Sequence, residues 1–153
     1  DTLEVEIYMK QKTRDLLFEL TVKEGDPNRI SNITGTLSGI VGSFDLSSQR
    51  ICGEAMNTSF PFARTNDKVT AHTRLLGTTG LKQSLRIDLT FTDGSSQTIE
   101  NDLTDLLKNF NDDMPTPMYI TGDLLTPIEA DMTATIVGWE NGNEENGENI
   151  EIY

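Results

Sequence analysis

Apolar and polar residues alternate with a period of two along most of the chain, which is typical of β-strands with one buried face. The clearest alternation covers residues 83–92, and we expect its four apolar side chains to be buried together: Leu85, Ile87, Leu89 and Phe91. We expect them to be opposed across the core by residues of other strands, namely Ile30, Leu37 or the face formed by Val5 and Ile7.

The same alternation predicts further strands at residues 3–9 and 16–22, strand-and-turn structure over residues 30–48 that includes a short strand at 41–46, and strands at 58–62, 68–76, 97–99 and 128–139. The first two have opposite parity, so a bulge or tight turn is expected near residues 11–14. In the third, we expect the strand to bend or bulge at Gly35, Gly39 and Gly42. In the last, one face is expected to carry Ala130, Met132, Ala134 and Ile136, and the other Thr133, Thr135, Val137 and Trp139.

Proline and glycine mark strand ends and turns between these strands, and one segment has a short helical pattern. Pro61 confines its strand to a sheet edge or a strand end, because proline lacks the backbone donor that a ladder needs. Residues 25–28 form a turn, and Asp93 with Gly94 favours a hairpin. Asp102 can cap one short helix whose apolar residues recur at helical spacing: Leu103, Leu106, Leu107 and Phe110. Residues 111–117 are expected to be a loop.

Short strands that recur every 8 to 12 residues with little helix predict an all-β fold, a sandwich or a barrel. Alternation with one polar face favours antiparallel sheets, so we expect an antiparallel β-sandwich with at most one short helix. The length of 153 residues fits one domain spanning residues 1–153. No apolar run reaches the roughly 20 residues of a membrane span, and the start at Asp1 without a signal peptide indicates a processed or trimmed product.

The formal charge of −13 is concentrated in the second half of the chain. Residues 1–86 carry 11 basic and 10 acidic side chains, a balance of +1, whereas residues 87–153 carry one basic and 15 acidic side chains, a balance of −14. This half would repel phosphate backbones, so we do not expect nucleic acid as a partner. It is either a solubility feature or a docking surface for a cation or a basic partner.

The sequence offers little catalytic chemistry. It has none of the common hydrolase, nucleotide-binding or metalloprotease motifs. Cys52 is the single cysteine, so it forms no intrachain disulfide, and His72 falls on the polar face of its strand. The carboxylate pairs Asp112 with Asp113 and Asp102 with Asp105 show no sign of the burial that raises a pKa for acid–base work. We therefore name no catalytic, cofactor-binding or metal-binding residues, and expect neither enzymatic activity nor a cofactor.

Two binding hypotheses remain open from the residues alone. Calcium would find oxygen ligands at residues 111–113 or 141–148, but neither segment has a recognised calcium-loop spacing. Asn32 and Asn57 begin glycosylation sequons, a short pattern that also arises by chance. Several aromatic residues would form a sugar-binding platform if exposed, although core packing accounts better for most of them: Phe44, Phe60, Phe62, Phe91 and Trp139.

Four segments in order resemble a known family. They are the opening LEVEIYMKQKTRDLLFELTV, then TGTLSGIVGSFDLSS, then LRIDLTFTDGSSQTI leading to NDLTDLL, and the ending TATIVGWENG. Together they resemble the fimbrillin-associated accessory and anchor subunits of the Bacteroidetes type V pilus system, which are surface lipoproteins. The resemblance implies two transthyretin-like β-sandwich domains behind a lipoprotein signal peptide, with this chain as the C-terminal domain of a longer precursor.

The chain departs from that family in three respects. A lipidated cysteine near the amino terminus is absent, and Cys52 cannot replace it because it follows some fifty residues of folded pattern. The amino-terminal domain is missing, and residues 108–125 form a longer loop than the family suggests. An anchor, an adaptor and a tip role therefore all remain open.

The resemblance implies a non-enzymatic structural or adhesive subunit of cell-surface fimbriae, acting in assembly, anchoring or adhesion. Its partners would be other fimbrial subunits and host or bacterial surface ligands, at the outer membrane, with attachment through a lipid anchor outside this chain. The alternative is a carbohydrate-binding module of a surface glycan-binding lipoprotein. The ending Ile150 to Tyr153 alternates again, and would pair with this domain's own sheet, fray, or add a strand to a neighbouring subunit.

Overall fold

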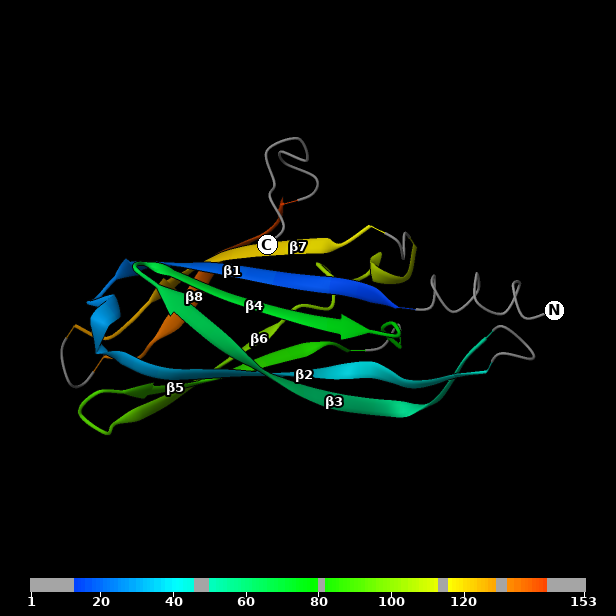
Figure 1. Ribbon diagram of the computed structural model, residues 1–153, viewed down its shortest axis with the longest axis horizontal. Helices are drawn as coiled ribbons and strands as arrows, with labels where there is room; N and C mark the ends of the chain where they lie inside the picture. The colour runs from blue at the N-terminus through cyan, green and yellow to red at the C-terminus, as the bar shows by residue number, and fades with distance from the viewer. Residues whose placement is uncertain (1–12, 46–49, 80–81, 113–115, 129–131, 143–153) are drawn as a thin grey trace.

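The chain folds into eight β-strands and two short 3-10 turns within the residues that the structure describes. The computed structural model describes residues 13–45, 50–79, 82–112, 116–128 and 132–142 (Figure 1), and the side chains of residues 42–54 lie outside that description. The elements are β1 (Arg14–Glu24), η1 (Pro27–Arg29), β2 (Ile30–Asp45), β3 (Arg50–Thr65), β4 (Lys68–Leu75), β5 (Ser84–Phe91), β6 (Ser96–Asp102), η2 (Phe110–Asp112), β7 (Met118–Leu125) and β8 (Thr135–Asn141).

All eight strands belong to one continuous sheet in the order β6-β5-β2-β3-β4-β1-β7-β8. Six of the seven pairs are antiparallel, and the pair of β1 with β7 is parallel. The sheet curls around the core until the two outer strands, β6 and β8, come into contact. The result is a nearly closed, barrel-like sheet rather than two separate layers.

This arrangement confirms the all-β class but differs from the expected antiparallel β-sandwich. Alternation reports which face of a strand is buried, and it carries no information on the direction of the neighbouring strand. The parallel pair arises because the connection after β6, described at residues 103–112 and 116–117, crosses one end of the barrel before β7 begins, and a parallel neighbour requires such a crossover. The transthyretin-like sandwich therefore stays an implication of the family resemblance.

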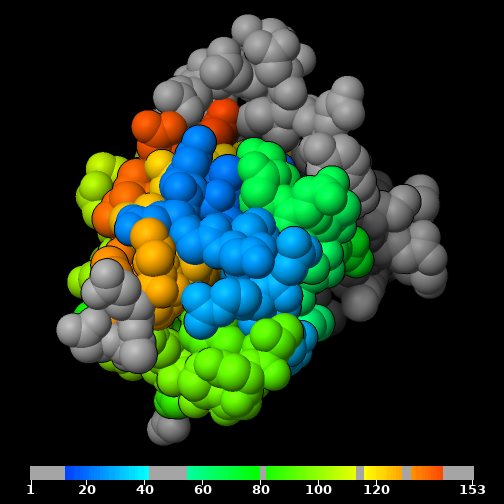
Figure 2. All heavy atoms as spheres, turned by 90° about the vertical axis from the view of Figure 1, so that its left-hand side faces the viewer, coloured from blue at the N-terminus to red at the C-terminus, as the bar shows by residue number. Residues whose placement is uncertain are grey.

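Short turns close one end of the barrel, which Figure 2 shows facing the viewer. The turn after β1 is built as expected, because Gly25 adopts a φ of +89° and the Asp26 side chain accepts a hydrogen bond from the Asn28 backbone N–H. The β5–β6 hairpin is also confirmed, since Gly94 has a φ of +89° and the Asp93 carboxylate accepts two hydrogen bonds from Ser95.

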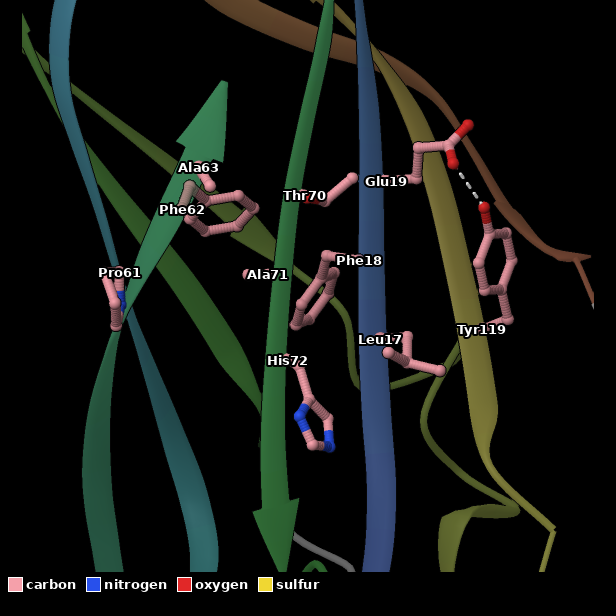
Figure 3. Close-up of a pocket in the computed structure, with 10 residues that line it drawn as sticks. All are labelled: Leu17, Phe18, Glu19, Pro61, Phe62, Ala63, Thr70, Ala71, His72 and Tyr119. Atoms are coloured by element: carbon pink, nitrogen blue, oxygen red, sulfur yellow. Dashed lines mark hydrogen bonds between the residues drawn. The ribbon is translucent and has the colours of Figure 1, made fainter. Parts of the chain in front are cut away.

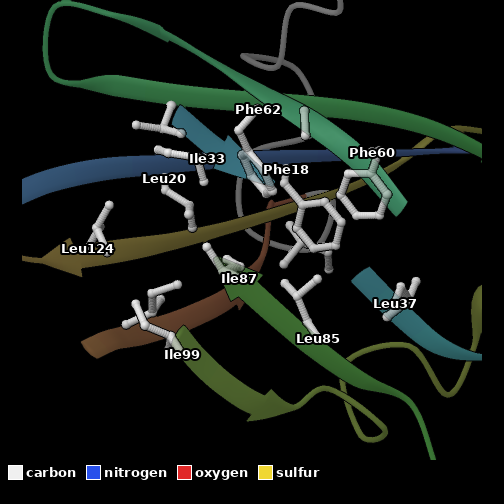
Figure 4. Close-up of a cluster of buried hydrophobic side chains, with 14 of the residues drawn as sticks. Phe18, Leu20, Ile33, Leu37, Phe60, Phe62, Leu85, Ile87, Ile99 and Leu124 are labelled. Atoms are coloured by element: carbon white, nitrogen blue, oxygen red, sulfur yellow. The ribbon is translucent and has the colours of Figure 1, made fainter. Parts of the chain in front are cut away.

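The inward faces of the strands form a single hydrophobic core (Figure 4). The four residues expected on β5 are buried, with 0 to 3 % of their surface exposed. Ile30 and Leu37 are buried too, but they are ladder partners of Phe91 and Leu85 in the adjacent strand, not residues across the core. The side chains that do lie across it come from β1 and β7, where the fully buried ones are Leu16, Phe18, Leu20, Ile120 and Leu124. Val5 and Ile7 lie outside the described residues.

Strand β2 bends where its glycines allow it. Its register to β3 shifts between Leu37 and Ile40 and again between Val41 and Ser43, as predicted for Gly39 and Gly42. Gly39 has a φ of +70°, and a Cβ there would meet the Lys82 carbonyl. Gly35 behaves differently from the expectation, because its ladder is regular on both sides. A Cβ at Gly35 would lie 2.8 Å from two phenylalanine rings, so this glycine makes room for the aromatic core.

Strand β8 is shorter than expected and changes face in its middle. Gly138 adopts a φ of +67°, and the pairing of β8 with β7 shifts register at this point. Val137 and Trp139 were expected on one face, but the bulge leaves Val137 47 % exposed and turns Trp139 against the core. Ala134 and Ile136 are buried as predicted, whereas Met132 is 40 % exposed because it precedes the strand; Ala130 lies outside the described residues.

Side chains of β6 bridge the seam where the two outer strands meet. The Gln97 amide donates to the Met132 carbonyl at 3.1 Å and accepts from the Ala134 backbone N–H at 2.6 Å. The Asn101 amide oxygen accepts from the Trp139 indole N–H at 2.6 Å. These three hydrogen bonds take the place of a backbone ladder between β6 and the segment around β8.

We expect Gln97→Ala to lower the free energy of unfolding by about 1–2 kcal/mol, because a partly buried N–H and a carbonyl lose their partner. Urea denaturation checks this, with Ser96→Ala on the same strand as the exposed control. Gln97→Glu should fall between the two, since it keeps the acceptor for Ala134 and loses the donor to Met132. Equal stability of all three variants would show that the seam contributes nothing.

The expected helix after β6 forms only as irregular turns. Asp102 accepts hydrogen bonds from the Thr104 backbone and hydroxyl, so it caps the segment as predicted. One α-type bond, from the Leu107 N–H to the Leu103 carbonyl, precedes the 3-10 turn η2. Leu103, Leu107 and Phe110 are fully buried, which confirms the apolar face while the helix itself does not extend.

The segment from 108 to 125 is not the long loop that the sequence suggested. Residues 118–125 form β7, which alternates buried and half-buried positions and lies beside β1. Gly122 and Asp123 lie in the middle of this strand, where they interrupt the alternation of apolar and polar residues in the sequence. The true connection is the shorter stretch around η2, of which residues 113–115 lie outside the description.

Candidate functional site

Strands β3 and β4 pair over only three residues each, and a groove opens beyond them. Ala63, Arg64 and Thr65 pair with Thr70, Val69 and Lys68. From Ala71 to Leu75, β4 pairs with β1 alone, and the preceding part of β3 pairs with β2 alone, within the described residues. The space between the diverging strands is a hollow of about 410 Å³, which we call the β3–β4 groove (Figure 3).

Pro61 marks the point where β3 becomes an edge. It pairs with Thr34 of β2, and no ladder partner lies on its other side among the described residues. Proline has no N–H to offer a neighbouring strand, so the residue cannot support a full ladder there. The prediction that Pro61 lies at a sheet edge is therefore confirmed.

Aromatic rings form the floor of the groove. Phe18 of β1 stacks on Phe60 with ring centroids 5.8 Å apart and lies 6.1 Å from Phe62. The Trp139 ring meets Phe18 edge-on, with ring centroids 6.4 Å apart. Offset and edge-on pairs of this kind stabilise a core beyond the area they bury. The floor is consequently rigid and apolar.

Polar side chains on the outer face of the sheet form one rim of the groove. The Tyr119 hydroxyl donates to the Glu19 carboxylate at 2.6 Å, as Figure 3 shows. Lys68 donates to the Thr21 hydroxyl at 2.8 Å and lies 3.6 Å from the same carboxylate. These contacts join β4, β1 and β7 across their outer faces.

Asp15 binds the side chains of His72 and Arg74 at the open end of the groove. Its carboxylate accepts from His72 Nε2 at 3.0 Å and from Arg74 Nε at 2.9 Å. The hydrogen bonds from His72 and then Arg74 hold the pKa of Asp15 below its ordinary value of 3.8. His72 faces solvent with 53 % of its side chain exposed, as the parity of its strand predicted.

We expect acid to remove part of the stability that Asp15 contributes. Its pKa is lower in the folded chain than in the unfolded chain, so its contribution is complete above about pH 4 and is lost as pH falls through the lower, folded value. Asp15→Asn should therefore flatten the dependence of the urea midpoint on pH below about pH 4. Asp88→Asn, at the exposed pair with Arg86, is the control, and an equal effect of the two substitutions would contradict the assignment.

The rim does not assemble a nucleophile and a base. His72 and Glu19 both line the groove, yet His72 binds Asp15 on the solvent side and Glu19 binds Tyr119. In the part of the chain that the structure describes, no three His, Cys, Asp or Glu side chains gather as metal ligands. Two strand edges above an apolar floor are instead the features that bind an extended peptide strand.

The carboxylates and amides singled out in the sequence lie apart from the groove. The Asn111 amide makes two 2.9 Å hydrogen bonds to the Thr78 backbone, so its oxygen is already engaged and is not placed as a calcium ligand. Asp102 caps its turn, and Asp105 lies 3.4 Å from Lys108 on the surface. Asp112 is exposed, and Asp113 and residues 143–148 lie outside the described residues.

The proposed sugar platform is not present among the described aromatic residues. Phe60, Phe62 and Phe91 are 3 to 8 % exposed, and Trp139 is only partly exposed with its indole N–H bound to Asn101. The side chains of Phe44 and Cys52 lie outside the description, although their backbones pair within the β2–β3 ladder. Asn32 and Asn57 are exposed on β2 and β3, so both sequons are accessible.

Sequence reasoning did not identify the groove. Pro61 was the available signal, because it placed a sheet edge in a segment that otherwise reads as a strand. The divergence itself depends on the length of the β3–β4 ladder, and local alternation does not encode it. No helix within the described residues is both long and apolar enough to cross a membrane.

The fold is similar to solved structures of fimbrial proteins. A candidate adhesin from Bacteroides ovatus matches with a TM-score of 0.55 and 14 % sequence identity, over 85 % of this chain and 50 % of that one. The fimbrial anchor protein Mfa2 from Porphyromonas gingivalis matches with a TM-score of 0.55 and 15 % identity, over 84 % of this chain and 46 % of that one.

These structures confirm, at the level of the fold, the resemblance to fimbrial subunits that four sequence segments suggested. The chain spans about half the length of each of them. No protein-family model matches the chain, and no curated protein does. The likeness therefore concerns the fold, and what the chain does is a separate question.

Proposed function

We propose that this chain is a structural or adhesive domain of a cell-surface fimbrial subunit. The observation that carries the proposal is the agreement between two independent likenesses. The four sequence segments resemble fimbrillin-associated subunits, and the folded chain resembles an anchor protein and a candidate adhesin over 84 to 85 % of its length. The sequence identity to these two structures is only 14 to 15 %, so the structural likeness reflects the fold, whereas the first likeness reflects the sequence segments.

The geometry of the described residues agrees with a binding domain. Asp15 and Glu19 are engaged in surface contacts, and a hollow of about 410 Å³ is a groove between strand edges. A nearly closed sheet with a rigid aromatic core is a scaffold suited to transmitting force along a surface fibre. We place the chain as one domain of a longer subunit, which its match to about half of each solved structure supports.

Within this proposal, the partners are other fimbrial subunits, and the chain is exposed at the cell surface. Attachment to the outer membrane would come from a lipid anchor outside residues 1–153. Anchoring, assembly and adhesion are three roles for the same domain, and the name of one solved neighbour as an anchor protein favours anchoring.

Deleting the gene in its own bacterium tests the proposal. We expect fewer fimbriae, fimbriae released from the cells, or cells that adhere less, as measured by electron microscopy and an adherence assay. Detached fibres in the medium would support anchoring, whereas intact fibres on poorly adherent cells would support a tip or adhesive role.

The control is the same deletion strain carrying the intact gene in trans, which should restore number, attachment and adherence together. A second complementation with Phe18→Asp should fail, because a charge in the aromatic core unfolds the domain. Fimbriae of normal number, length and attachment on normally adherent deletion cells would overturn the proposal.

A further inference from the structure

We propose that another hollow, at the end of the barrel that short turns close, binds a sugar ring that carries a carboxylate. The hollow measures about 410 Å³ and lies between three segments: η1 with Arg29, the β5–β6 hairpin, and residues 127 and 128 after β7. These segments meet on the face that Figure 2 shows, in light blue, lime green and orange. We call this hollow the Arg29 pocket. Its volume is near the lower end for small-molecule sites, which suits a single ring.

The inference is independent of the fimbrial role, because it rests on the side chains of the pocket itself. Two contacts hold the Arg29 guanidinium in place: its Nη1 donates to the Pro127 carbonyl at 3.0 Å, and its Cζ lies 5.5 Å from the centre of the Phe91 ring. The Thr92 N–H also donates to the Arg29 carbonyl at 2.7 Å. The guanidinium is therefore positioned before a ligand arrives, and binding costs little side-chain entropy.

The remaining edge of this guanidinium has no counter-charge. Within the described ranges, no carboxylate forms an ion pair with Arg29, and its Nε and Nη2 donors have no protein acceptor. The exposed Arg86, by contrast, pairs with Asp88 at 3.2 Å. The Nε–H and Nη2–H groups lie side by side and match the two oxygens of a carboxylate, a two-point pair that is stronger than a single hydrogen bond. A carboxylate is therefore the group that this edge is built to bind.

The other walls of the pocket supply partners for hydroxyl groups. Asp93 Oδ1 accepts both hydrogen bonds from Ser95, while its Oδ2 has no partner in the described part of the chain. The Ser96 hydroxyl lines the pocket, is equally unpaired among those residues, and can both donate and accept. Ile128 is 60 % exposed and offers an apolar wall to the C–H groups of a ring. One carboxylate, several hydroxyl groups and a C–H face together describe a sugar acid.

The charge of Asp93 narrows the choice of anion. Hydrogen bonds from Ser95 hold the pKa of this carboxyl below its ordinary value of 3.8, so it is ionised at neutral pH. Beside Asp93, a doubly charged phosphate would be repelled more strongly than a single carboxylate. The carboxyl terminus of a peptide would pair with Arg29 too, but it brings no ring of hydroxyl groups for Asp93 and Ser96. The sugar acid is therefore the better match, and the peptide terminus is an outcome that the experiment separates from it.

Two-dimensional NMR of the 153-residue chain tests the ligand with a matched pair of sugars. Methyl β-glucuronide carries the carboxylate, and methyl β-glucoside has the same ring with a CH₂OH group in its place. We expect the glucuronide to shift the Arg29 Nε–H signal and the amides of residues 95–97, saturating with a dissociation constant on the order of 1 mM. The glucoside should bind at least about tenfold more weakly, because it lacks the partner for Arg29.

Three results with these probes would overturn the proposal. The first is the absence of a saturable shift at about twenty times the expected dissociation constant. The second is equal binding of the two sugars, which would remove the carboxylate from the argument. The third is binding of acetate or of acetyl-glycyl-glycine as tight as that of the glucuronide, which would assign the pocket to a simple carboxylate or to a peptide terminus.

Substitutions in the protein locate the site. Arg29→Met should weaken glucuronide binding at least about tenfold, and Arg86→Met, at an arginine that already pairs with Asp88, should change it less than about twofold. Because Arg29 also stacks on Phe91, a second variant leaves it in place. Ser96→Glu puts a carboxylate on the exposed wall of the pocket, where it competes with the ligand for Arg29, and should also weaken binding about tenfold.

Asn57→Glu adds the same charge at an exposed position of β3 outside the pocket, so it is the control for Ser96→Glu and should leave binding unchanged. The amide spectrum of each variant shows whether the chain is still folded. Undiminished glucuronide binding in a folded Arg29→Met or Ser96→Glu variant would overturn the proposal. So would shifts in the unchanged chain that are centred away from Arg29 and the β5–β6 hairpin.

Discussion

Phe18→Ala should lower the free energy of unfolding by about 3–5 kcal/mol, the largest loss expected from truncating a single apolar side chain here. Phe18 is 1 % exposed and lies at the centre of the aromatic cluster, where it contacts Phe60, Phe62 and Trp139. Removing the ring leaves a cavity bordered by rigid rings, which cannot collapse without leaving their own packed positions. Urea denaturation followed by tryptophan fluorescence measures the loss.

Trp139 reports on the same cavity, because its indole meets Phe18 edge-on. Val137→Ala on the exposed side of β8 is the control, and it should change the free energy of unfolding by less than about 0.5 kcal/mol. A loss below about 1 kcal/mol for Phe18→Ala would mean that the ring is not packed as described. Such a result would also remove the apolar floor on which the β3–β4 groove depends.

Strands with an unbroken alternation could be predicted from the sequence. Leu85 to Phe91 and Leu16 to Val22 each keep one parity from end to end, and the structure buries both sets. The Asp93–Gly94 hairpin was predictable for a different reason, since turn residues there impose their own geometry. In these segments local preference and tertiary packing agree.

Strands in which a glycine interrupts the apolar–polar alternation could not be predicted in the same way. Gly122 leaves β7 without an apolar side chain at its central inward position, because the Ile136, Trp139 and Leu20 side chains already fill that space. Gly138 shifts the register of β8, so Trp139 enters the core from a position that alternation assigns to solvent. In both cases the packing of a distant strand overrides the local pattern.

The β3–β4 groove could not be predicted from the sequence for a further reason. Alternation in β3 and β4 correctly gives their buried faces, but the point at which two paired strands separate depends on the twist and closure of the whole sheet. Pro61 indicated an edge without indicating what lies beside it. The predicted absence of a catalytic constellation also left the sequence with no residues around which to look for a site.

Arg14 is a structural residue that the sequence analysis did not identify as important. Sequence reasoning assigned it no role beyond the segment expected to shift register and the opening segment of the family resemblance, yet its side chain is 6 % exposed. Its guanidinium donates to the carbonyls of Thr116, Asn109 and Phe110, the last at 2.7 Å, and lies 5.3 Å from the Phe110 ring centre. It therefore joins the first residue of β1 to the crossover that leads into the parallel strand β7.

We expect Arg14→Met to lower the free energy of unfolding by about 2–4 kcal/mol. Methionine fills much of the same space, but at least one buried carbonyl then loses a charge-assisted partner. Arg14→Lys should recover only part of the loss, because one ammonium group cannot reach three carbonyls on different sides as the planar guanidinium does. Arg86→Met, at an arginine that is 54 % exposed, is the matched control and should cost less than about 1 kcal/mol.

Hydrogen exchange separates this role from a general loss of stability. If Arg14 holds the crossover against β1, amides of residues 107–112 and of β7 should exchange faster in Arg14→Met under conditions where β5 stays protected. Uniform acceleration throughout the sheet would mean that Arg14 contributes only to global stability. The local result is the one that the geometry supports, because all three carbonyl acceptors lie on the crossover and the parallel β1–β7 pair begins directly after it.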